Sequence, residues 1–230
     1  MKKAEKSQGV LYRKYRPDTF KDVIGQEHIV QVLKGSIKLE KISHAYLFSG
    51  SRGTGKTSCA RILAREIGTT PNDLVEMDAA SNRGIDDVRE IRESVNSLPF
   101  ESRFKVYIID EVHMLTRDAW NAFLKTLEEP PKHVVFILAT TELEKVPDTV
   151  ISRCQSFVFK QPNEAMLKDF ALAVAKKEGV TLEKEAAELV ALLGDGSFRD
   201  AHGILEKVLS STDDKKITRD EVEKVSGAPK

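Results

Sequence analysis

Residues 50–57 have the types and spacing that bind a polyphosphate. They read Gly-Ser-Arg-Gly-Thr-Gly-Lys-Thr and fit the pattern G-x-x-x-x-G-K-[ST], known as a P-loop. Its glycines let backbone N–H groups point inward around phosphate oxygens, and the N-terminus of the helix that follows adds partial positive charge. We expect Lys56 to reach the β- and γ-phosphates of a nucleotide, and the Thr57 hydroxyl to hold Mg²⁺. The alternative is a glycine-rich strand-to-helix turn that matches by chance.

Two adjacent carboxylates follow an apolar run further along the chain, at Asp110 and Glu111. After a P-loop, this pair indicates the hydrolytic half of a nucleotide site. Asp110 is expected to complete the Mg²⁺ shell, directly or through water. Glu111 is expected to orient and deprotonate the water that attacks the γ-phosphate. Without a P-loop, such a pair would more simply form a helix cap or a solvated turn. His113 is expected to be a packed or surface residue.

Hydroxyl groups and an arginine further along the chain are candidates for contacts with the nucleotide phosphates. Thr140-Thr141 follows the apolar run 134–139, so a hydroxyl there could contact the γ-phosphate or the attacking water; an ordinary turn is the alternative. Ser197 and Asp200 have the spacing of a helix cap. Arg199 lies in the first turn of that helix, where its positive charge is unfavourable beside the positive end of the helix dipole. A bound phosphate would offset this repulsion.

Short apolar runs alternate with helical patterns through the first two thirds of the chain. Runs that are apolar on both faces are typical of a parallel sheet covered on both sides; they lie at residues 45–48, 74–77, 106–109, 134–139 and 157–159. Apolar residues at helical spacing lie between them, at residues 60–67, 85–95 and 120–127. Ligands of parallel sheets bind outside the carboxyl ends of the strands, where the P-loop and the acids are expected.

After Pro162 the strand pattern stops and helical patterns continue to the end of the chain. Apolar stripes predict four helices, through residues 167–174, 186–193, 201–208 and 222–225, and the first two end at Gly179 and Gly194. The sequence thus predicts an α/β nucleotide-binding domain at 1–161, with a flexible tail at 1–9. A small all-α lid domain is predicted at 162–230.

Composition narrows the class of protein. The 230 residues carry 36 Lys+Arg and 36 Asp+Glu, with 40% hydrophobic residues, as in an ordinary globular protein. Zero net charge argues against a surface that grips nucleic acid throughout. No apolar run is long enough to cross a membrane. Basic residues do gather near the N-terminus, where they suit a phosphate-bearing partner or simply keep a tail solvated: Lys2, Lys3, Lys6, Arg13, Lys14 and Arg16.

The cysteine and histidine content points to a cytoplasmic location without structural zinc. Cys59 and Cys154 cannot build a disulfide framework, and no Cys or His pair has the spacing of a zinc site.

Several longer motifs resemble the gamma/tau family of bacterial DNA polymerase III subunits, the AAA+ ATPase motors of the sliding-clamp loader. The similarity covers roughly residues 10–226. It rests on YRPDTF at 15–20, VIGQEH at 23–28, HAYLFSG at 44–50, DEVHML at 110–115, LKTLEEPP at 124–131, ISRC at 151–154 and GSFRD at 196–200.

The resemblance implies an AAA+ core with a five-stranded parallel sheet, a helical lid, and a Mg²⁺-dependent ATPase that uses ATP/ADP. Thr141 would be sensor 1, Arg199 sensor 2, and Arg153 an arginine finger that acts on the neighbouring subunit. Residues near adenine and ribose would be Tyr12, Arg13, Val23 and Ile24. Phosphate contacts would come from Arg199 and from Gly50, Ser51, Arg52, Gly53, Thr54, Gly55, Lys56, Thr57 and Ser58.

The implied partners are other loader subunits of the delta and delta-prime type, the sliding clamp, and primer–template DNA facing a helix that starts near residues 81–83. No membrane partner is implied. The family counts as part of a DNA-directed DNA polymerase, although no polymerase site is present here.

Two departures from the family pattern matter. Family members usually carry a four-cysteine zinc module after the P-loop helix; only residues 68–73 stand there, so we predict no zinc. The collar that holds the full-length family in a hetero-oligomeric ring would follow about where this chain ends, so the chain alone is expected to be monomeric.

The sequence leaves two alternatives to a clamp-loader motor. One is another AAA+ loader or remodeller, such as a Holliday-junction motor. The other is a nucleotide-regulated scaffold that hydrolyses little ATP.

Overall fold

The computed structural model describes residues 10–212 and 215–227. The basic residues predicted in the N-terminal tail before residue 10 lie outside this range. The chain divides into two compact units. Residues 18–160 form one, called here the sheet unit, and residues 10–17 with the described part of 161–230 form the other, called the helical unit.

The sheet unit is built on five parallel strands in the order β2-β3-β4-β1-β5. Their bounds are β1 Ala45–Ser49, β2 Leu74–Asp78, β3 Lys105–Asp110, β4 Val134–Thr140 and β5 Gln155–Val158. Ser49 is in register with Thr140, and Asp78 with Asp110. The carboxyl ends of these strands therefore meet along one edge, and the five predicted strands are confirmed.

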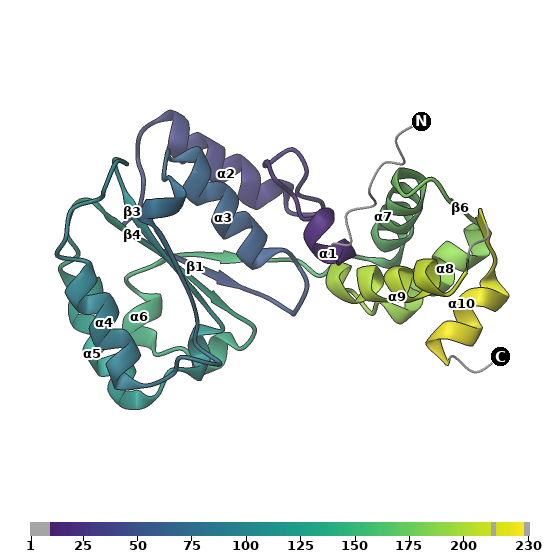
Figure 1. Ribbon diagram of the computed structural model, residues 1–230. Coiled ribbons are helices and arrows are strands. Elements are labelled where there is room, and N and C mark those ends of the chain that lie inside the picture. Colours follow the sequence, from purple (N-terminus) through teal and green to yellow (C-terminus); the bar gives the residue numbers. More distant parts are fainter. Residues whose placement is uncertain (1–9, 213–214, 228–230) are drawn as a thin grey trace. The chain divides into compact units, whose positions relative to one another are not determined.

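Helices cover both faces of this sheet (Figure 1). On one face lie α2 Glu27–Lys38 and α3 Lys56–Glu66, whose apolar side chains pack against Tyr46 and Ile108. On the other lie α4 Ile85–Ser94, α5 Arg117–Glu128 and the short α6 Asp148–Ile151, packed against Tyr107 and Phe136. Neighbouring residues of β3 thus enter opposite cores, which explains why the strand is apolar on both faces.

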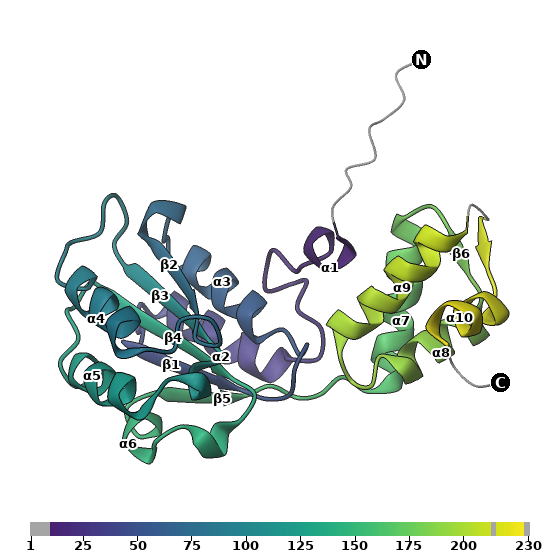
Figure 2. The same cartoon turned by 60° about the horizontal axis from the view of Figure 1, so that its bottom comes forward.

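The helical unit packs five helices around a core of its own (Figure 2). They are α1 Leu11–Lys14, α7 Glu164–Lys177, α8 Lys184–Leu193, α9 Phe198–Ser211 and α10 Arg219–Ser226. The side chain of Asn163 caps α7 and that of Ser197 caps α9, each by accepting an N–H from the first turn. The capping interpretation of Ser197 is confirmed.

Two predictions about the second unit need correction. It is not purely helical, because β6 Thr181–Leu182 pairs in parallel with β7 Lys216–Ile217. The units also do not divide simply at residue 161. Residues 10–17 belong with the helical unit, since Leu11 is buried in its core and Tyr15 packs beside it.

Candidate nucleotide-binding site

The P-loop joins β1 to α3 and has the backbone that its glycines were expected to allow. Gly50, Gly53 and Gly55 have φ values of +143°, +74° and +98°. A side chain at Gly50 would also place a Cβ 2.5 Å from the backbone oxygen of Phe159. Two features therefore require glycine at position 50, the conformation and the close approach.

Lys56 lies within the loop instead of extending into solvent. Its side chain is buried, and Nζ donates to the backbone oxygens of Gly50 at 2.7 Å and Ser51 at 2.9 Å. Thr54 closes the same loop by donating from Oγ1 to the Ser51 oxygen. An ammonium group held among loop carbonyls, at a helix N-terminus, suits an anionic phosphate chain. Ser58 lies in the first turn of α3, and Arg52 is exposed on the loop.

The two predicted metal ligands are brought together. Thr57 Oγ1 donates to Asp110 Oδ2 at 2.7 Å, so the start of α3 meets the end of β3. A hydroxyl beside a carboxylate is an oxygen donor set that Mg²⁺ accepts, with its remaining positions filled by water and phosphate. These residues fit the ion, and their role as its ligands remains a proposal.

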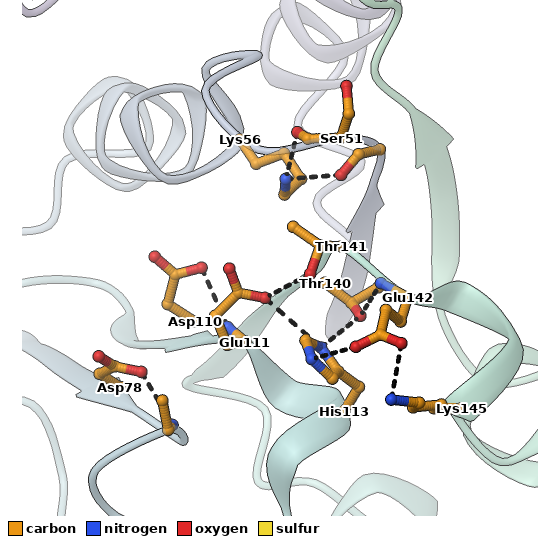
Figure 3. A network of polar contacts seen from close by, with 12 residues as sticks. Ser51, Lys56, Asp78, Asp110, Glu111, His113, Thr140, Thr141, Glu142 and Lys145 are labelled. Carbon is orange, nitrogen blue, oxygen red and sulfur yellow. Dashed lines mark hydrogen bonds and ion pairs between the residues drawn. The ribbon is translucent and has the colours of Figure 1, made fainter. Parts of the chain in front are cut away.

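Glu111 and Thr141 also meet, although they are 30 residues apart. Thr141 Oγ1 donates to Glu111 Oε2 at 2.9 Å, and His113 Nδ1 lies 3.4 Å from the same oxygen (Figure 3). The Glu111 side chain remains 32% exposed, so water can reach it. Glu111 can therefore act as a base at the carboxyl end of β3, and the hydrogen bond from Thr141 holds its carboxylate in one orientation.

The predicted arginines lie on different units. Arg153, just after α6 in the sheet unit, pairs with Glu128 Oε1 at 2.7 Å and donates to the Thr149 backbone oxygen. Burial raises the pKa of the adjacent Cys154 thiol to about 12, so this thiol stays protonated. Arg199 is exposed in the first turn of α9 of the helical unit.

The four residues predicted near adenine and ribose are also split between the units. Tyr12 and Arg13 lie on α1 of the helical unit, where Arg13 Nε donates to the Tyr12 hydroxyl at 3.2 Å. Val23 and the exposed Ile24 lie in the sheet unit before α2. Residues 81–83 lie between the end of β2 and α4, which begins at Ile85, slightly later than the resemblance implied.

Two polar residues that contact the predicted ones were not singled out from the sequence. Glu128 contacts Arg153, and Glu142 contacts His113. The His113 side chain, expected to be packed or at the surface, is 5% exposed and therefore packed. The only available signal was position: Glu128 ends the helical stripe of α5, and Glu142 directly follows Thr141.

The sequence of this chain is similar to those of known proteins. The family model of the DNA polymerase III delta subunit matches residues 25–83 and 69–163. The chain is 45% identical over 225 residues to DNA polymerase III subunit tau of Bacillus subtilis, and 44% identical over 225 residues to that of Escherichia coli. Each match covers 89% of this chain. The chain belongs to the gamma/tau family of DNA polymerase III subunits.

The chain spans only part of the length of the relatives that it matches. It spans 40% of the length of the B. subtilis tau subunit and 60% of the gamma subunit from Buchnera aphidicola subsp. Baizongia pistaciae. A solved gamma subunit-related protein from Thermotoga maritima superposes with a TM-score of 0.59 and 26% identity, over 77% of this chain and 60% of that one.

Solved structures of more distant proteins confirm the fold. The Holliday junction branch migration motor RuvB of T. maritima superposes with a TM-score of 0.75 and 24% identity, over 93% of this gamma/tau chain and 72% of that chain. The predicted α/β fold, with a P-loop after the first strand of a five-stranded parallel sheet, is therefore confirmed. No helix in the described part of the chain is long and apolar enough to cross a membrane.

Proposed function

We propose that this chain is the ATP-binding and ATP-hydrolysing motor module of the DNA polymerase III clamp loader, which places the sliding clamp on primed DNA. One observation carries the proposal most strongly. Lys56 and Thr57 begin α3, Asp110 and Glu111 lie at the end of β3, and Thr141 follows β4. Hydrogen bonds join Thr57 to Asp110 and Thr141 to Glu111. Family membership supplies the clamp-loading context.

Each residue of this set has a distinct task. Lys56 and the P-loop amides bind the phosphates, while Thr57 and Asp110 would hold Mg²⁺. When bound, the ion neutralises charge that develops on the phosphate oxygens. Glu111 takes the proton of the attacking water, and Thr141 keeps the Glu111 carboxylate in place. In its helical unit, Arg199 supplies a cation for the phosphates.

Arg153 is proposed to act on a neighbouring subunit's nucleotide. Such arginine fingers raise turnover by roughly 10³–10⁵, because they stabilise charge in the transition state. The proposed neighbours are loader subunits of the delta and delta-prime type, with the clamp and primer–template DNA as further partners. By itself, the chain should bind MgATP but hydrolyse it slowly.

Steady-state phosphate release tests the proposal. Turnover should require Mg²⁺, be slow for the chain alone, and rise when loader subunits, clamp and primed DNA are added together. Lys56→Ala is the background control. Turnover that equals this background under all these conditions would contradict the proposed function.

A further inference from the structure

The backbone at Glu111 is held in a conformation that non-glycine residues rarely adopt. Its φ and ψ are +48° and +44°, in the left-handed region. The Glu111 N–H donates to Asp110 Oδ1 at 3.0 Å, and its carbonyl accepts the Met114 N–H at 2.9 Å. Such residues persist where surrounding contacts determine them, and they concentrate at functional sites.

His113 lies beside the Glu111 carboxylate and makes polar contacts through both ring nitrogens. It belongs to the 3₁₀ turn Val112–Met114 that follows Glu111. Nδ1 lies 3.0 Å from Thr140 Oγ1 and 3.4 Å from Glu111 Oε2, while Nε2 lies 3.1 Å from Glu142 Oε1 (Figure 3). Polar partners at both nitrogens hold this buried ring in one orientation beside the Glu111 carboxylate.

Glu142 fixes the orientation of this ring. A carboxylate only accepts hydrogen bonds, so Nε2 must carry the hydrogen that faces it. Glu142 is itself held twice: its N–H donates to Thr140 Oγ1 at 3.0 Å, and its Oε2 pairs with Lys145 Nζ at 2.6 Å. In the neutral ring, Nδ1 then accepts the Thr140 hydroxyl, which leaves Thr141 as the donor to Glu111.

We propose that His113 is a positioning residue for Glu111. Its ring, oriented by Glu142 and Thr140, closes one side of the Glu111 carboxylate and keeps that carboxylate on the Thr141 hydroxyl. This inference rests on the proposed role of Glu111 as the base. The polar partners of His113 in the described part of the chain are Thr140, Glu111 and Glu142, none of which belongs to the P-loop. The loss of His113 should therefore slow hydrolysis and leave nucleotide binding intact.

The test measures ATP affinity by calorimetry and kcat by phosphate release in the complex with loader subunits, clamp and primed DNA. His113→Ala should lower kcat about ten- to a hundredfold, because misplacement of a reacting group by about 1 Å has effects of this size. Its ATP Kd should stay within about twofold of wild type. His113→Asn should retain more of the kcat, because its amide can take the place of Nδ1.

Glu142→Ala supplies a second variant that does not depend on the stability of His113→Ala. It should lower kcat in the same direction, and the double variant should be no slower than His113→Ala, since both changes break one network. Glu144→Ala, an exposed acid two residues away, is the matched control and should match wild type.

Unchanged kcat in the His113 and Glu142 variants would overturn the inference, as would ATP affinity that falls in parallel with kcat. A double variant whose kcat is lowered by the product of the two single effects would also contradict the inference. A wild-type protein that hydrolyses no more ATP than Lys56→Ala would instead overturn the proposed function, and the role of His113 with it.

Discussion

Gly50 and Gly35 show how differently two glycines of one chain respond to the same added atom. At Gly50, φ is +143° and an added Cβ would meet a backbone oxygen at 2.5 Å. At Gly35, inside α2, an added Cβ meets nothing within 4 Å. We therefore expect Gly50→Ala to weaken ATP binding at least about tenfold and to lower the melting temperature.

The matched change, Gly35→Ala, should leave ATP binding unchanged and stabilise the protein by about 0.5–1 kcal/mol, because alanine loses less backbone entropy in a helix. Calorimetric titration and thermal unfolding measure both variants. Equal ATP affinity of the two would show that the strained entry into the P-loop is not needed.

At the residue scale, the sequence was most informative where chemistry depends on local spacing. The P-loop, Asp110 and Glu111 could be predicted because each lies in a short contiguous motif. His113 could not be assigned its contacts, because Thr140 and Glu142 come from the end of another strand. The contact of Glu128 with Arg153 could not be predicted for the same reason, because the two residues are 25 positions apart in the sequence.

At the scale of elements, apolar periodicity predicted the five strands and the main helices, because each buries a full face or stripe. It missed β6 and β7, whose two residues each are too short for any period. It also assigned α1 to the sheet unit. That helix has four residues, and only tertiary packing of Leu11 and Tyr15 shows where it belongs.

His202 on α9 gives the helical unit an expected pH dependence. The ring lies between Tyr15 and Phe170, and its buried Nε2 has no hydrogen-bond partner among the described residues. Burial lowers the pKa of His202 to about 4, from an ordinary 6.5. As the pH falls, His202 is therefore protonated in the unfolded chain before it is protonated in the folded one. The free energy of unfolding decreases as the pH falls from 6.5 towards 4.

The loss from this one group should reach about 3 kcal/mol by pH 4. Urea unfolding of wild type and His202→Phe at several pH values measures it. The variant should be at least as stable at pH 7 and should lose less stability on acidification. Parallel pH profiles of the two proteins would show that His202 is protonated equally well in the folded state.

At the scale of the whole molecule, the proposed role of Arg153 as an arginine finger predicts that activity is shared between chains. Arg153 pairs with Glu128 of its own chain. The Arg153 side chain is nevertheless 34% exposed, so a neighbouring subunit can reach it. Lys56→Ala and Arg153→Ala chains should each be nearly inactive in an assembled ring. Mixed together, they should regain activity, because one brings the arginine and the other the intact nucleotide pocket.

The mixing experiment is read by phosphate release from rings that contain one or both variants. No recovery in the mixed rings would count against an arginine supplied in trans. Fast hydrolysis by dilute, demonstrably monomeric Arg153→Ala protein would rule it out.

The central claim is that binding and hydrolysis of MgATP are divided between Lys56 and Glu111, and one paired measurement tests it most directly. ATP binding by calorimetry and phosphate release are compared for Lys56→Ala and Glu111→Gln. Lys56→Ala should lose binding, because the cation within the loop is gone. Glu111→Gln should bind ATP as wild type does and release at least about a hundredfold less phosphate, since the base is gone while the P-loop, Thr57 and Asp110 remain. Equal loss of ATP binding in both variants would contradict the account.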